Sequence, residues 1–532
     1  MSPGRVRQSR TDEESGHVSQ PAVGVPGAAG QWADMAYARA VDRPSAREFL
    51  ARTVDAGTFV SWDTPPQHGA LDPAYEAELR SAAGSSGADE AVLTGEARIG
   101  GHRIALVVSE FGFLGGSIGV ATARRLVAAI ERATALRLPL LAAPASGGTR
   151  MQEGTVAFVQ MIGVSAAVTA HKAAGLPYLV YLRHPTTGGV FASWGSLGQL
   201  TLAEPGALIA FLGPRVYTAL YGGEFPAGVQ TAENLFAHGL LDGVVAPAEL
   251  AGLLGRVLDV LAAPRTPTLT APPAQSPAPT GADAWDSITR SRRPDRPGIR
   301  RLLDEAAQDV VTLSGTGEGE LDPALMLGLA RFGPVPCIVL GQDRRGQTVE
   351  RPLGPGALRV ARRGMRLAVE LRLPLLTVVD TAGAALSVAA EERGLAGEIA
   401  RCLEDLVTLD APVVSVLLGQ GTGGAALALL PADRVVAARH AWLAPLPPEG
   451  ASAIRHRDVA HAAAMARAQG VGVADLVAAG IVDRVVDERP DAADEPVEFC
   501  RRLGAVLAGE LAALGDRPGP DRLARRARKF AR

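Results

Sequence analysis

Cysteine and lysine are both scarce in this 532-residue sequence. The three cysteines, Cys337, Cys402 and Cys500, lie far apart, and no C-x-x-C pair occurs. A disulfide framework and a cysteine zinc site are therefore not expected, and this usage is typical of a protein of the reducing cytoplasm. Only two lysines, Lys172 and Lys529, occur among 53 basic residues.

The sequence also lacks a charge excess and a long apolar run. Its formal net charge is −3, which does not favour a basic nucleic-acid surface. No run of eighteen apolar residues is present, so no membrane span is expected, and the polar N-terminus has no apolar signal core. The nine histidines show no metal-ligand spacing, and we expect no metal site.

Composition divides the chain into four parts. Residues 1–40 have the Ser, Gly, Pro and charge content of a disordered segment, and residues 263–283 have the Pro/Ala/Thr content of an extended linker. One domain is expected on each side of that linker, at 41–262 and at 284–532. The basic end "DRLARRARKFAR" is more typical of a solvated tail than of a partner contact.

The two long parts repeat one another. The hexapeptide "LRLPLL" occurs at Leu136 and again at Leu371, an offset of 371 − 136 = 235 residues. Pro177 and Pro412 share this offset, as do the glycines at 188 and 423 that follow the next apolar run. Further on, "HGLLDGVV" matches "AGIVDRVV" after a six-residue insertion. The chain is therefore predicted to hold two copies of one fold.

Each copy alternates helical and strand-like segments. Helical apolar spacing occurs at 119–136, 157–175, 359–371 and 398–409, and short apolar runs lie at 138–145, 176–182, 373–380 and 411–418. This alternation predicts layered α/β domains with buried strands.

Paired glycines follow several of the predicted strands. The turns are "FGFLGGSIG", "APASGGTR", "PTTGGVFA" and "GQGTGGAA". Glycine lets the backbone approach a ligand, and the free N–H groups at a helix start favour negative charge, so such turns can stabilise an oxyanion. One such turn by itself is usually only a tight strand-to-helix connection, but recurrence in both copies favours function. No P-loop, convincing Rossmann fingerprint or G-x-S-x-G elbow is present, and His184 before "PTTGG" is interpreted as structural or solvent-facing.

These segments resemble a known family. Residues 41–262 are similar to the beta subunit of bacterial acetyl-CoA carboxylase carboxyltransferase through "FGFLGGSIG", "LPLLAAPASGGTRMQEG", "PTTGGVFASWGSLG" and "LAEPGALIAFLGPRV". Residues from 284 onward resemble the alpha subunit, more loosely, through "AWDSITRSRRPDRP", "LPLLTVVDTAGA" and "GQGTGGAALAL". The resemblance implies a fused carboxyltransferase with two tandem ClpP/crotonase-like (β-β-α superhelix) domains.

The implied reaction moves a carboxyl group from carboxybiotin, held on a separate carrier protein, to acetyl-CoA and forms malonyl-CoA for fatty acid biosynthesis. Negative charge develops on the thioester oxygen and on the ureido oxygen of biotin, so two sets of backbone donors are required. The biotin nitrogen can accept the substrate proton, which removes the need for a strong side-chain base. Neither lysine lies in a Met-Lys-Met motif and no ATP site is evident, so a biotin carboxyl carrier protein and a biotin carboxylase are expected in trans.

The resemblance also implies site residues. Gly188 and Gly189 are the first set of donors, on the acyl-CoA side. When the second half is aligned with the alpha subunit without a gap, Gly424 and Ala425 are the second set of donors. An alignment with one gap selects Gly423 and Gly424 instead. The other two turns supply the predicted substrate-binding glycines, which are Gly115, Gly116, Gly147 and Gly148.

Departures from the family leave alternatives open. The four-cysteine zinc ribbon of the beta subunit is absent, so no zinc is predicted, and "DTAGAA" replaces the usual Asp-Thr-Pro-Gly-Ala-Tyr. The alternatives are a propionyl-CoA carboxyltransferase, a malonyl-thioester decarboxylase, and a weakened acyl-CoA-binding scaffold. The expected assembly is a homodimer that mimics an alpha2beta2 tetramer, with no nucleic-acid or membrane partner.

Overall fold

The computed structural model describes residues 43–69, 71–264, 283–348, 350–515 and 519–531. The predicted disordered segment and nearly all of the predicted linker lie outside the described residues. The boundaries of the two domains therefore stay predictions.

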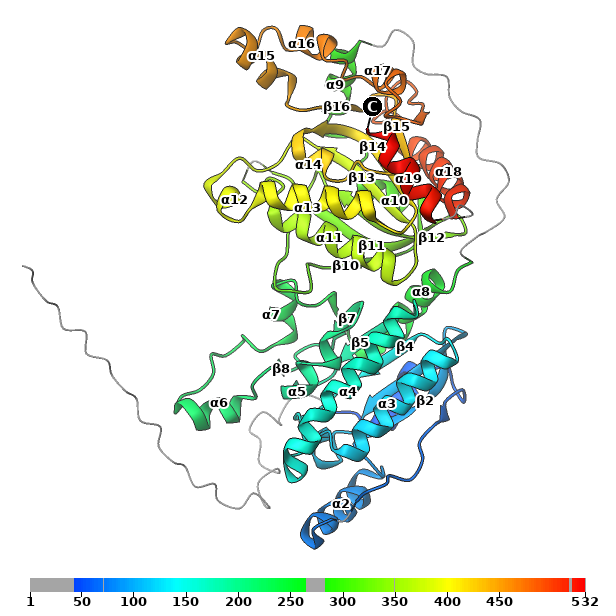
Figure 1. Cartoon of the computed structure of the whole chain (residues 1–532), viewed down its shortest axis with the longest axis vertical. Coiled ribbons are helices and arrows are strands. Elements are labelled where there is room, and N and C mark those ends of the chain that lie inside the picture. Colours follow the sequence, from blue (N-terminus) through cyan, green and yellow to red (C-terminus); the bar gives the residue numbers. More distant parts are fainter. Residues whose placement is uncertain (1–42, 70, 265–282, 349, 516–518, 532) are drawn as a thin grey trace, which may run out of the picture. The chain divides into compact units, whose positions relative to one another are not determined.

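Two mixed sheets with the same strand order form the framework (Figure 1). The first runs in the order β1 (Val60–Ser61), β2 (Val92–Ile99), β3 (His102–Ser109), β4 (Leu140–Ala143), β5 (Tyr178–Leu182), β7 (Leu200–Ala203), β9 (Gly243–Val244). The second runs β10 (Gln308–Leu313), β11 (Leu325–Phe332), β12 (Val335–Gln342), β13 (Leu375–Thr381), β14 (Val413–Thr422), β15 (Arg434–Ala438), β17 (Arg484–Val486). In each sheet the first three strands are antiparallel and the later pairs are parallel.

The register of the strands carries the same offset as the sequence. Leu140 pairs with Tyr178 in the first sheet, and Leu375 pairs with Val413 in the second. A small parallel pair of β6 (Thr186–Thr187) with β8 (Ile209–Ala210) matches the pairing of the end of β14 with β16 (Trp442–Ala444). The predicted internal duplication is therefore present in the backbone hydrogen bonding.

Four long helices overlap the predicted ranges, although three of them begin three or four residues earlier than predicted. In the first half α3 (Val120–Ala135) and α4 (Gly154–Ala173) lie side by side over the sheet (Figure 1). In the second half α11 (Pro355–Glu370) and α13 (Leu395–Thr408) occupy the corresponding positions in the chain. Four predicted strands and four predicted helices are thus confirmed. The smaller helices of the first half are α1 (Ala46–Thr53), α2 (Pro73–Ser86), α6 (Pro214–Tyr221), α7 (Ala232–Ala237) and α8 (Pro247–Leu261).

The second half carries further helices that cover its core. They are α9 (Ala284–Ser291), α10 (Ile299–Ala306), α12 (Val388–Glu392), α15 (Pro448–His456), α16 (Ala462–Ala468), α17 (Val473–Ala478), α18 (Pro496–Gly515) and α19 (Gly519–Lys529). The expectation of a solvated basic tail is wrong for α19. Arg526 is 1% exposed, pairs with Asp433, and donates to the carbonyl oxygens of Leu406, Leu409 and Ala411. A buried guanidinium with this many acceptors is a docked side chain.

A buried ion pair joins the two halves. Residues 43–532 form one compact unit, and at the contact Arg363 on α11 donates to Asp242, which follows α7, at 2.9 Å. Arg363 also donates to the carbonyl oxygens of Ser314 and Gly315, and Asp242 accepts from the amide of Ser314 at 3.1 Å. The two sheets are therefore connected by charge as well as by apolar packing.

Candidate functional site

Three glycine turns of the first half converge beyond the ends of the parallel strands. The turn after β3 forms the short helix η2 (Leu114–Gly116), the turn after β4 holds Gly147 and Gly148, and β6 leads into α5 (Gly188–Phe191). The amide of Gly147 donates to the carbonyl of Gly115 at 2.9 Å, and the amide of Ile118 donates to the carbonyl of Gly148 at 2.9 Å. The structure thus brings the predicted glycines of these turns together.

The glycines are required by the backbone at two of these positions. Gly116 has φ +63°, and a Cβ there would overlap the carbonyl oxygen of Ala145. Gly188 has φ +63°, and a Cβ there would lie 3.4 Å from the Cα of Gly148. Because side chains rarely adopt this left-handed conformation and the turns lie this close, glycine is favoured on both grounds.

The amides at the start of α5 are placed to act as donors. The first N–H groups of a helix have no partner within it, and the N-cap residue Thr187 makes no side-chain hydrogen bond to them. Gly148, by contrast, directs its amide to the hydroxyl of Ser146 at 3.0 Å, so that amide is occupied within its own turn. Gly188 and Gly189 can therefore offer two amides to a developing negative charge.

The second half repeats this turn. Gly423 begins α14 (Gly423–Leu427) with φ +66°, as Gly188 begins α5, and Thr422 likewise makes no side-chain cap. By position in the repeat, Gly423 and Gly424 correspond to Gly188 and Gly189. Ala425 is the third residue of the helix, is fully buried, and accepts a hydrogen bond from the side chain of Gln342 at 2.7 Å. Which two amides serve as donors here stays a prediction.

The second turn of the second half is also preserved, with one change of residue. The amide of Gly383 donates to the hydroxyl of Thr381 at 3.1 Å, as Gly148 donates to Ser146, and Gly383 has φ +132°. The pair Gly115–Gly116, however, corresponds by the same offset to Glu350 and Arg351. The two halves therefore differ most in the first turn, where the second half has two charged side chains.

The ionisable groups beside the turns are mostly held in fixed roles. Burial, with the charge of Arg43 adding to it, lowers the pKa of His184 to about 4, so its imidazole is neutral near pH 7. Its Nδ1 accepts from the amide of Leu208 at 3.0 Å, and its own amide donates to Glu204 at 2.9 Å. In the second half, burial raises the pKa of Asp380, whose Oδ1 accepts from the amide of Gln420 at 3.1 Å. His184 is thus a weak base with a structural role.

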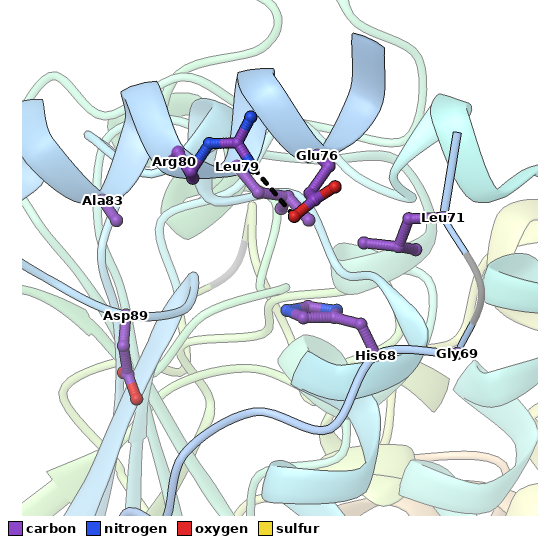
Figure 2. Close-up of a pocket in the computed structure, with 8 residues that line it drawn as sticks. All are labelled: His68, Gly69, Leu71, Glu76, Leu79, Arg80, Ala83 and Asp89. Atoms are coloured by element: carbon purple, nitrogen blue, oxygen red, sulfur yellow. Dashed lines mark hydrogen bonds and ion pairs between the residues drawn. The ribbon is translucent and has the colours of Figure 1, made fainter. Parts of the chain in front are cut away.

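Two cavities lie in the first half. One of about 300 Å³ adjoins the glycine turns, because Gly112, Ala145 and His184 line it. The other, of about 480 Å³, lies between α2 and the loop at His68 (Figure 2). Figure 2 shows the Glu76–Arg80 pair of α2 facing the ring of His68. None of the predicted glycines lines either cavity. Among the described residues, no cluster of three or more metal-ligating side chains occurs.

Sequence reasoning missed the side chains behind the first-half turns. Arg150, which follows the Gly147–Gly148 turn, is fully buried against the equally buried Glu90. Nothing in the local pattern marks this pair, because its members are 60 residues apart. The sequence offered one signal of this pair, which is that Arg150 lies close to the end of a predicted buried strand.

Known proteins are similar to this chain over most of its length. The family model described as "Carboxyl transferase domain" matches residues 42–519. The "Probable biotin-dependent acyl-coenzyme A carboxylase beta3 subunit" of Mycobacterium tuberculosis (strain CDC 1551 / Oshkosh) is 61% identical over 479 residues, covering 90% of this chain and 96% of that protein. The "Acetyl-coenzyme A carboxylase carboxyl transferase subunits beta/alpha" of Salinispora arenicola (strain CNS-205) is 39% identical over 508 residues, covering 91% and 89%.

A solved structure agrees on the fold. Transcarboxylase 12S, crystallised as a hexamer with hydrolysed methylmalonyl-coenzyme A, superposes with a TM-score of 0.68 and 20% identity, covering 87% of this chain and 88% of that one. The predicted fold class of tandem crotonase-like α/β domains is thereby confirmed. With a family model that spans nearly all of the described residues and a relative at 61% identity, the chain belongs to the carboxyl transferase domain family.

Proposed function

We propose that this protein is the carboxyltransferase component of a biotin-dependent acyl-CoA carboxylase. The observation that carries the proposal is the duplicated helix-start turn, with Gly188 in one half and Gly423 in the other. Two such turns supply backbone donors for two separate negative charges, which is what transfer of a carboxyl group between two carriers requires.

The chemistry assigned to the two turns is as follows. Carboxybiotin loses CO2, and its ureido oxygen takes up negative charge while the ureido nitrogen gains basicity. That nitrogen removes the α-proton of the acyl thioester, the thioester oxygen becomes an enolate oxygen, and the α-carbon attacks CO2. Acyl-CoA and carboxybiotin are thereby converted into carboxyacyl-CoA and biotin. A strong side-chain base is not needed, which fits the low pKa of His184.

Acetyl-CoA is the first acceptor to test, and propionyl-CoA or a longer acyl-CoA is the alternative. The support for acetyl-CoA is the beta/alpha arrangement shared with the Salinispora relative, while the name of the mycobacterial relative gives only an acyl group. Biotin is expected on a separate carrier protein, charged by a separate biotin carboxylase, in the cytoplasm.

The direct test is reconstitution with a biotinylated carrier, a biotin carboxylase, ATP and bicarbonate. Acetyl-, propionyl- and long-chain acyl-CoA are offered at equal concentration, and labelled bicarbonate is followed into the acid-stable product. A product with at least one acyl-CoA is expected. No product with any of them, from a folded protein and active partners, refutes the proposal. Loss of label from malonyl-CoA without a biotin carrier supports the decarboxylase instead.

We propose further that the site is completed by a second copy of the chain. Among the described residues, one helical stretch, Met151–Ala173, is long and apolar enough to cross a membrane. It contains the short helix Met151–Glu153 and α4, follows the Gly147–Gly148 turn, and packs on α3. Its outward side chains are apolar: Ile162 is 72% exposed, and Val156 and Phe158 are each 60% exposed. An apolar face of this kind marks a protein contact.

The second half also exposes apolar side chains. Leu386 and Val388, which follow the Gly383 turn, are 96% and 72% exposed, and Ile454 on α15 is 74% exposed. Packing the two kinds of face together in a two-fold dimer covers both. We expect light scattering to give a dimer and I162E to give a monomer with reduced activity. T169E, at an exposed polar position of the same helix, is the matched control.

A further inference from the structure

A buried charge lies directly behind the first-half turns. The side chains of Arg150 and Glu90 are each 0% exposed, and they form an ion pair. Removing two charges from water is costly, and only their mutual attraction together with further hydrogen bonds can offset that cost. The bonds that these groups make show which part of the protein is held by them.

Arg150 holds the first glycine turn through its side chain and through its backbone. Its Nη2 donates to the carbonyl oxygen of Ser117 at 2.9 Å and to the hydroxyl of Thr122 at 3.1 Å, the latter at the start of α3. Its own amide donates to the carbonyl oxygen of Ile118 at 3.0 Å. Arg150, at the end of the second turn, therefore binds the carbonyl groups of two consecutive residues of the first turn, Ser117 and Ile118.

The same cluster fixes the beginning of α3. Glu153 accepts from the amide of Val120 at 2.6 Å and from the hydroxyl of Tyr75 at 2.5 Å, while Nη1 of Arg150 donates to that hydroxyl at 3.2 Å. Burial raises the pKa of Tyr75, so its hydroxyl stays protonated and remains a donor. Helix α2, the two turns and α3 thus meet at one guanidinium.

Gly188 lies next to this assembly, since a Cβ built on Gly188 would lie 3.4 Å from the Cα of Gly148. We infer that Arg150 is a positioning residue, which sets the spacing of the 114–119 and 146–149 turns and through them the direction of the amides at Gly188 and Gly189. The inference rests on the proposed function. A planar guanidinium with five donors can hold several acceptors at once, which the single ammonium of lysine cannot do.

The second half has no arginine at the equivalent position. The repeat offset pairs Arg150 with Ala385, whose amide makes the same backbone bond, to the carbonyl oxygen of Leu353 at 2.8 Å. The backbone contact between the two turns is therefore common to both copies, and the buried cation belongs to the first copy alone. Its function is accordingly tied to the first-half turn and not to the fold in general.

The test compares R150K with the wild-type chain in the reconstituted assay. A displacement of about 1 Å at a catalytic group can cost about 10²-fold in rate. An interaction made mainly in the transition state lowers kcat, while the KM for acyl-CoA changes little. We expect kcat to fall about 10- to 100-fold, with KM within about threefold. If R150K does not fold, E90Q tests the same cluster, with a smaller loss expected.

R526K is the matched control, since Arg526 is equally buried and bonded but anchors α19. It should lose stability and keep its kcat. Hydrogen–deuterium exchange gives a readout independent of turnover, because R150K should speed exchange at 114–119 and 147–149 and R526K should not. A folded R150K with wild-type kcat and wild-type exchange overturns the inference. A wild-type chain inactive on every acyl-CoA overturns the proposed function instead, and the exchange comparison still decides the role of Arg150.

Discussion

Substituting Asp242 tests how strongly the two halves are coupled. Asp242 is 1% and Arg363 is 10% exposed at the side chain, and the two groups are 2.9 Å apart. D242A removes the carboxylate and leaves a nearly buried guanidinium whose remaining acceptors are carbonyl oxygens of Ser314, Gly315 and Gln199. Removing one partner of a buried ion pair typically costs about 3–5 kcal/mol.

Two further bonds of Asp242 increase the cost. Its carboxylate accepts from the amide of Thr201 at 2.8 Å and from the amide of Ser314 at 3.1 Å, and both amides lose that acceptor in D242A. Each buried donor left without a partner costs about 1–3 kcal/mol. We therefore expect the free energy of unfolding to fall by at least about 3–5 kcal/mol in D242A.

The assay is chemical denaturation of D242A, R363M and the double variant. R363M leaves a buried carboxylate unpaired, so both single variants should be strongly destabilised, and the double variant should lose less than the sum of the two. E76A is the control, because the Glu76–Arg80 pair is 56% and 66% exposed and should contribute less than about 1 kcal/mol. Strictly additive losses, or a D242A midpoint equal to that of E76A, refute the reasoning.

Three further predictions follow from the site. Because His184 has a pKa near 4 in the folded chain and an ordinary pKa of 6.5 when unfolded, the unfolded state binds more protons between these values. The contribution of His184 to the free energy of unfolding is therefore fully present above about pH 6.5 and falls by up to about 3 kcal/mol toward pH 4. In H184Q the free energy of unfolding should change less with pH across this range, which denaturation at a series of pH values measures. G116A should destabilise the chain more than G115A. Both glycines have positive φ, but only the added Cβ at position 116 would overlap a carbonyl oxygen, that of Ala145. Thermal melts of the two variants measure the difference. Elemental analysis should find no stoichiometric zinc, and treatment of the purified protein with EDTA, removed before the assay, should leave carboxyl transfer unchanged, whereas bound zinc or loss of activity after that treatment contradicts the absence of a metal site.

The repeating architecture could be predicted because its signals are local and periodic. Apolar runs of 5–8 residues mark buried parallel strands, and helical spacing marks the crossovers between them. The offset of 235 residues reappears in the register, where Leu140–Tyr178 and Leu375–Val413 are equivalent pairs. Three of the four glycine turns could be located for the same reason, because each of them follows a predicted strand, whereas "FGFLGGSIG" was placed only by the long helix after it.

Contacts between distant residues could not be predicted in this way. Arg150 and Glu90 are separated by 60 residues, and a lone charge in a sequence is usually solvent-exposed. The apolar pattern of α4 predicts a helix but does not distinguish burial within the chain from burial by a partner. The basic residues of α19 were interpreted as solvated because their acceptors, Asp433 and the carbonyls after α13, lie more than 90 residues away.

The matching segments "HGLLDGVV" and "AGIVDRVV" show how one copy can change while the fold is kept. Asp242 exchanges two hydrogen bonds with the backbone of Thr201, and Asp483 exchanges the equivalent two with Val435, so each carboxylate extends the pairing of its own sheet. Beyond this, Asp242 binds Arg363 of the other half, whereas Asp483 binds Lys529 of α19. The bonds between each aspartate and the backbone of its own sheet are therefore shared by the two copies, whereas the cationic partners of the two carboxylates differ. Arg150 and Ala385 follow the same rule at the turns, so asymmetry between the two donor sites can arise without any change of topology.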